Sequence, residues 1–103
     1  MSKDKVKKIV NKYIEVLKKE GFPLKAVYLY GSYAKGKAHY GSDIDVAIIS
    51  PKLRKNWNKV ETWLWTKTRD VNPLIEPVGY APEDFKETDP LVAEIKVSGI
   101  RII

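Results

Sequence analysis

The chain has 103 residues, 44% of them hydrophobic and 31% charged, so we expect residues 1–103 to form a single folded domain rather than a disordered or multidomain chain. It contains no cysteine and one histidine, which excludes disulfide frameworks, thiolate zinc sites and cysteine nucleophiles and leaves oxygen as the ligand for any metal. No apolar run approaches the roughly 18 residues of a membrane-spanning helix, and no signal peptide is visible, so we expect a cytoplasmic protein without membrane contact.

The first predicted element is an amphipathic helix over Lys3–Glu20. Its apolar residues recur at spacings of three and four, as expected for a helix with one buried face: Val6, Ile9, Val10, Tyr13, Ile14 and Leu17. Lysines occupy the opposite face and contribute to a formal net charge of +6. That charge permits an acidic partner, but no DNA- or RNA-reading motif accompanies it. We therefore interpret the lysines as a solvated face and do not expect direct nucleic-acid binding.

Two strands are expected next, on either side of a connection that contains several glycines. The apolar, aromatic run Ala26–Tyr30 stops at Gly31 and is typical of a buried strand. Ser42–Ser50 predicts a second strand, in which Asp43 and Asp45 share one face and the alternating apolar residues share the other. The far end of this strand is apolar on both faces, which indicates a central position in the sheet.

The second half of the chain begins with a predicted helix from Leu53 to Thr68. Its apolar stripe includes Trp57, which we therefore expect in the core. Trp63 and Trp65 flank that stripe on opposite sides, so at least one of them should leave an aromatic surface at the margin of the domain. Such a surface serves either as extra cover for the core or as a contact for a partner.

An extended segment over Asn72–Tyr80 follows and is expected at a sheet edge, because Pro77 cannot donate a hydrogen bond to a neighbouring strand. Pro82–Phe85 predicts a short helical turn. Asp89 suits the N-cap of a last helix, and residues 100–103 suit a final strand. The alternation of helices and strands predicts an α/β domain, of the α+β type, in which helices flank a small mixed sheet.

The residues that carry chemistry lie in the connection between the two predicted strands. Gly31 has no side chain, so a phosphate can approach the backbone there, and Ser32 offers an N–H and a hydroxyl where a short helix would open. Asp43 and Asp45 stand two residues apart on one strand face, which suits a pair of carboxylates that binds a hard cation. The pattern predicts a site for phosphoryl or nucleotidyl transfer.

A third carboxylate is expected from Glu76 on the edge strand or from Asp70 at its start. Two carboxylates about 4 Å apart repel by about 4 kcal/mol at an effective dielectric of about 20, so a cluster of three needs a cation or a proton to offset the repulsion. Mg²⁺ is the natural candidate, because it takes carboxylate and phosphate oxygens. Two such ions would activate an attacking hydroxyl and stabilise a leaving pyrophosphate.

This arrangement resembles the minimal nucleotidyltransferases of the DNA polymerase β superfamily, whose signature is Gly-Ser, a short helix and then Ser-Asp-x-Asp on the next strand. The matching residues are Gly31, Ser32, Gly36, Ser42, Asp43 and Asp45. Nearly the whole chain fits, since Ile75–Phe85 also looks like the third strand of the family and its following turn. The resemblance implies a polymerase β-like fold and an Mg²⁺-dependent nucleotidyltransferase with ATP as substrate.

The resemblance also implies a role for individual residues. It gives catalytic and metal-binding roles to three of them: Asp43, Asp45 and Glu76. It gives nucleotide contacts to four: Gly31, Ser32, Lys35 and Ser42. Lys35 stands where the family often has arginine, so it offers a phosphate a single point charge instead of a bidentate contact. The alternative is that Lys35 only keeps its loop soluble.

Many small members of this family act as the antitoxin of a HEPN (higher eukaryote and prokaryote nucleotide-binding) toxin, which they neutralise by adenylylating a tyrosine. The resemblance therefore implies transfer of AMP from ATP to a hydroxyl of a HEPN-type partner protein. The length of the chain favours a separate protein acceptor, or a homo-oligomer that completes the cleft, over a self-contained enzyme acting on a small molecule or RNA. The alternative is a binding antitoxin that masks its partner without catalysis.

Overall fold

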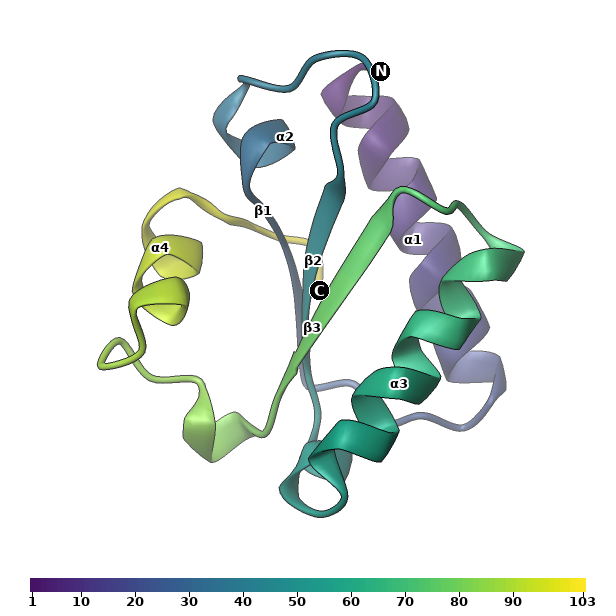
Figure 1. Cartoon of the computed structure of the whole chain (residues 1–103), viewed down its shortest axis with the longest axis vertical. Coiled ribbons are helices and arrows are strands. Elements are labelled where there is room, and N and C mark those ends of the chain that lie inside the picture. The colour runs from purple at the N-terminus through teal and green to yellow at the C-terminus, as the bar shows by residue number, and fades with distance from the viewer.

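Four strands form one mixed sheet, in the order β3-β2-β1-β4, in the computed structural model, which describes residues 1–103 (Figure 1). The strands span Ala26–Tyr30 (β1), Ile44–Ile49 (β2), Ile75–Tyr80 (β3) and Ile100–Arg101 (β4). β2 runs antiparallel to β1 and parallel to β3, whereas β4 pairs antiparallel with the other side of β1. The end of β1 and the starts of β2 and β3 therefore lie at the same end of the sheet.

Helices cover both faces of this sheet, as Figure 1 shows. The long helices α1 (Lys3–Lys19) and α3 (Trp57–Lys67) pack on one face, and α4 (Pro90–Ser98) covers the other. The larger core lies beneath α1 and α3 and includes Val10, Leu29, Ile48 and Leu64. The smaller core lies beneath α4 and includes Ala47, Ile49 and Ile95. Neighbouring residues of one strand enter different cores because successive side chains point to opposite faces. Helices that flank a small mixed sheet confirm the predicted α/β class.

Helix α1 follows its prediction to within one residue. The Ser2 hydroxyl caps the helix by accepting a hydrogen bond from the Lys5 N–H at 3.1 Å. In the middle of the helix the buried Tyr13 hydroxyl donates to the Leu64 carbonyl at 2.7 Å and so connects α1 to α3 across the core. Most lysines of α1 are exposed, as expected for a solvated face.

The connection from β2 to α3 differs from its prediction. Leu53 lies in a separate 3₁₀ turn, Pro51–Arg54, and Asn56 adopts a left-handed conformation with a φ of 55° before α3 begins at Trp57. The predicted helix from Leu53 to Thr68 is therefore wrong at its start. The spacing of apolar residues could not reveal this break, because Leu53 is buried and keeps the spacing of a helical residue.

The prediction that Trp57 is a core residue is also wrong, since 45% of its surface is exposed. Its indole N–H donates to the Gly79 carbonyl at 3.1 Å, and the Glu61 carboxylate accepts from the Gly79 N–H at 3.0 Å. The N–H and carbonyl of Gly79 point away from β2, toward the open edge of β3, where Pro77 has no N–H to donate. β3 is the outermost strand, so its predicted edge position is confirmed. Side chains of α3 thus close an edge that could otherwise pair with another strand.

The other two tryptophans of α3 divide between core and surface. Trp63 stacks on Phe22 with ring centroids 5.1 Å apart, whereas 43% of Trp65 is exposed. The prediction that at least one of the two leaves an aromatic surface is confirmed by Trp65.

The C-terminal elements follow the predicted order. Pro82–Asp84 forms a 3₁₀ turn, and Asp89 caps α4 by accepting a hydrogen bond from a backbone N–H of the first turn at 2.9 Å. The final strand is shorter than predicted, because only Ile100–Arg101 has strand geometry against β1. No helix of the chain has both the length and the apolar character that crossing a membrane requires.

Candidate active site

The candidate site is built on the turn that follows β1. Gly31 has a φ of 75° and a ψ of −151°, a combination open essentially only to glycine. A Cβ atom at this position would also overlap the Asp45 carboxylate and would lie 3.1 Å from its Cγ. The sequence predicts that the missing side chain admits a phosphate, but in the structure Asp45 occupies that space. Gly31 therefore lets a carboxylate of β2 approach the backbone of the turn.

Ser32 is half-buried and opens the predicted short helix, α2 (Ser32–Lys35), which Gly36 ends. Lys35 is the last residue of this helix, and its Nζ lies 2.6 Å from Oε1 of Glu94 on α4. Sequence analysis missed Glu94. It lies 59 residues from Lys35 along the chain, and no local pattern connects the two.

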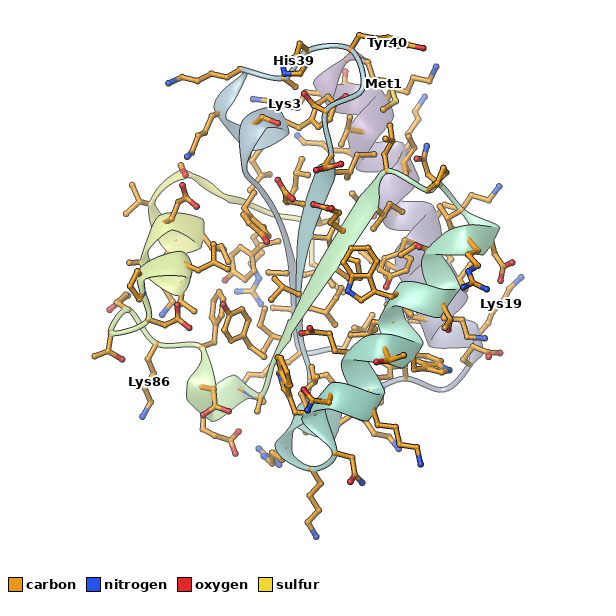
Figure 2. All side chains as sticks on the ribbon, in the orientation of Figure 1. Met1, Lys3, Lys19, His39, Tyr40 and Lys86 are labelled. Carbon is orange, nitrogen blue, oxygen red and sulfur yellow. The ribbon has the colours of Figure 1, made fainter.

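The loop between α2 and β2 leads to Asp43. The hydroxyl of the buried Ser42 accepts a hydrogen bond from the His39 N–H at 2.9 Å, and the Ser42 N–H donates to the His39 carbonyl at 3.0 Å. These two bonds close a turn, so the observed role of Ser42 is to hold the loop, and its nucleotide contact stays a prediction. β2 begins at Ile44 rather than at Ser42. His39 is exposed on this loop beside Tyr40, as Figure 2 shows.

Tyr30, Asp45 and Glu76 form a row across the sheet, on the face that α4 covers. In the strand register Asp45 lies opposite Tyr30 on β1 and opposite Glu76 on β3. Neighbouring strands are about 5 Å apart, which makes these side chains neighbours. Asp43, two residues before Asp45, lies close enough to Glu76 for its negative charge to raise the pKa of that carboxyl. The structure thus brings together Asp43, Asp45 and Glu76, whereas Asp70 lies in an exposed turn after α3.

The ionisable groups of this row and the neighbouring Asp43 shift one another's pKa values. Partial burial, followed by the nearby charge of Asp43, raises the pKa of Asp45 above its usual value. Partial burial and the charges of both aspartates likewise raise the pKa of Glu76. Burial and then the Asp45 charge raise the pKa of the Tyr30 hydroxyl, so this phenol stays protonated. The candidate site therefore has an excess of negative charge that a cation would relieve.

These residues fit a hard divalent cation by their chemistry. The converging side chains are all carboxylates, whose oxygens are the ligands that Mg²⁺ prefers in proteins. In their present positions, no group of three or more His, Cys, Asp or Glu side chains could hold a metal ion. The strand register sets the Cα positions, and the side chains keep the freedom to turn toward an ion.

A family model for the nucleotidyltransferase domain matches residues 10–98, from the middle of α1 to the end of α4. The match includes the turn after β1 and all three converging carboxylates. The protein adenylyltransferase MntA of Shewanella oneidensis is 42% identical over 46 residues, which make up 45% of this chain and 33% of MntA. The aligned segment thus spans only about a third of that relative.

Solved structures share the fold. A protein of Sulfolobus solfataricus described as a candidate nucleotidyltransferase has a TM-score of 0.67 at 17% identity, covering 96% of this chain and 80% of that one. A toxin-antitoxin structure with AMP-PNP has a TM-score of 0.65 at 24% identity, and a mutant MntA-HpeT toxin-antitoxin structure has 0.64 at 22%. Each of these two toxin-antitoxin structures matches 90% of this chain, and the match covers 71% of the solved chain. With the family match over most of its length, the chain belongs to the nucleotidyltransferase domain family.

Proposed function

We propose that this chain is a nucleotidyltransferase that transfers AMP from ATP to a hydroxyl of a partner protein. The observation that carries the proposal is the convergence of Asp43, Asp45 and Glu76 beside the turn at Gly31. Membership of the nucleotidyltransferase domain family and the similarity to the protein adenylyltransferase MntA support this class of reaction. In the reaction the acceptor oxygen bonds to the α-phosphorus of ATP, the bond from that phosphorus to the bridging oxygen breaks, and pyrophosphate leaves.

The nucleotide would bind at the turn that follows β1. The N–H and hydroxyl of Ser32 would donate hydrogen bonds to phosphate oxygens. Gly31 would act by letting the Asp45 carboxylate lie against the turn, in the space that a Cβ would fill. Lys35 would add one positive charge from the end of α2. Ser42 would act mainly by holding the loop that places Asp43.

Asp43, Asp45 and Glu76 would hold Mg²⁺. When bound, the metal supplies positive charge to the phosphates and lowers the pKa of an attacking hydroxyl. Glu76 has a second task in the proposal: it accepts the proton of the acceptor hydroxyl as the new bond forms. A carboxylate that lies beside the attacking oxygen can take this proton as a general base.

We infer that the acceptor is a tyrosine of a HEPN-type toxin. The support comes from the sequence resemblance and from the two structural neighbours that are toxin-antitoxin proteins. In this proposal the chain is the antitoxin, and AMP on the tyrosine would silence the toxin.

The test is label transfer from α-³²P-ATP to a HEPN-type protein encoded beside this gene, with and without Mg²⁺. We expect Mg²⁺-dependent label on a tyrosine of that partner, lost with Asp45→Asn, while Asp70→Asn serves as the matched control and keeps the label. Neutralisation of the toxin without any label would contradict transfer and favour masking by binding. Label on RNA or on a small hydroxyl compound, with none on the partner, would contradict the proposed acceptor.

A further inference from the structure

One ion pair joins α2, the short helix at the turn proposed to bind phosphate, to α4. Lys35 ends α2, and its Nζ lies 2.6 Å from Oε1 of Glu94, which belongs to α4. The two side chains are 34% and 42% exposed, so an incoming ligand can reach the pair. The cation assigned to a phosphate thus already has a carboxylate partner within this chain.

Glu94 also lies close enough to Asp45 and Tyr30 for its negative charge to act on both groups. Its charge adds to the effects of burial and of Asp43 in raising the pKa of Asp45, and it also raises that of Tyr30. Glu94 therefore adds a negative charge beside Lys35, at a site proposed to bind a polyphosphate. A nucleotide phosphate that contacts the Lys35 ammonium group must therefore compete with the Glu94 carboxylate for it.

We propose that Glu94 is a positioning residue that holds Lys35 in the nucleotide-free protein and competes with the nucleotide phosphates for its ammonium group. The inference rests on the proposed function, because it assigns Lys35 to the nucleotide. A lysine carries one compact charge, so a contact with a phosphate oxygen requires it to give up or weaken its contact with Glu94. An exposed pair is weakly stabilising, so the exchange is easy, and Glu94 adjusts affinity rather than blocking the site.

The test is calorimetric binding of the non-hydrolysable analogue AMP-PNP, with Mg²⁺, to the full chain and three variants: Glu94→Gln, Lys35→Met and the double variant. Glutamine keeps the size of the side chain and removes its charge. We expect Glu94→Gln to tighten binding by about two- to fivefold, as expected for release of an exposed ion pair. The gain should shrink at high salt, which screens the pair. Lys35→Met should weaken binding, and adding Glu94→Gln to it should change nothing further.

A matched control comes from a neighbouring exposed pair, in which Nζ of Lys96 lies 3.3 Å from Oε1 of Glu87. Glu87→Gln removes one carboxylate near α4 without touching Lys35, so AMP-PNP affinity should stay at the wild-type value. Thermal unfolding of every variant separates an effect on binding from a loss of fold.

Unchanged or weaker binding by Glu94→Gln would overturn the inference. Tightening that persists without Lys35 would also overturn it, because Glu94 would then act by direct repulsion of the phosphates. A wild-type chain that binds AMP-PNP but transfers no AMP would refute the proposed function and leave this comparison intact. A wild-type chain that does not bind AMP-PNP would refute both.

Discussion

Replacing Gly31 with alanine tests whether this glycine positions the Asp45 carboxylate. The backbone at Gly31 has a φ of 75° and a ψ of −151°, and forcing a residue with a Cβ into such a region costs about 1–3 kcal/mol. The new Cβ would overlap the carboxylate of Asp45, whose side chain must turn off its preferred angle at a further cost of about 1 kcal/mol. We expect the free energy of unfolding to fall by about 2–4 kcal/mol.

The same displacement should reduce Mg²⁺-dependent AMP transfer by about 10²-fold, since a shift of about 1 Å in a reacting group has effects of this size. Urea unfolding monitored by tryptophan fluorescence measures the stability, and label transfer measures the activity. Gly36→Ala is the matched control, because Gly36 also has a positive φ, of 71°, but nothing lies within 4 Å of its Cβ position. We expect this control to lose about 1–2 kcal/mol of stability and to keep its transfer activity.

A third variant isolates the steric effect. In an Asp45→Ala background the overlap is gone, so Gly31→Ala should cost clearly less stability than it does in the wild type. If Gly31→Ala costs no more than Gly36→Ala, and transfer survives, then Gly31 does not position Asp45 and our account of the turn is wrong.

Three further predictions concern the carboxylates and the exposed aromatic surface. The pKa of Asp45 is raised in the folded protein, so ionisation of Asp45 destabilises the fold, and the free energy of unfolding in EDTA should fall as pH rises through that pKa. Asp45→Asn should flatten this fall. An unchanged pH profile in that variant would contradict the prediction. Glu76→Gln should lower transfer by about 10²- to 10⁴-fold and largely spare ATP binding, with Asp70→Asn close to wild type, whereas the reverse ranking would show that the third carboxylate is misplaced. Trp65→Ala should leave the melting temperature of the isolated chain nearly unchanged and weaken its complex with the partner by about 2 kcal/mol or more, and a large loss of thermal stability would instead assign Trp65 to the core.

The sequence by itself determined the elements that depend on local pattern. The stripe of α1, the strand Ala26–Tyr30 and the capping residue Asp89 are readable because period, turn residues and caps act over a few neighbours along the chain. The family resemblance was likewise readable, since its signature lies within one continuous segment that ends at Asp45. The local pattern misled where a residue keeps the spacing of a helix without belonging to one, as Leu53 does.

Tertiary structure decided which distant residues share one place. Glu76 lies beside Asp45 only because β3 pairs with β2 in one register, and a shift of one residue would turn Glu76 to the other face. Trp57 lies half-exposed at the sheet edge, where its indole N–H donates to the Gly79 carbonyl, a partner that apolar spacing does not reveal. Pairings of this kind join residues far apart in sequence, so the folded chain sets them and no local pattern records them.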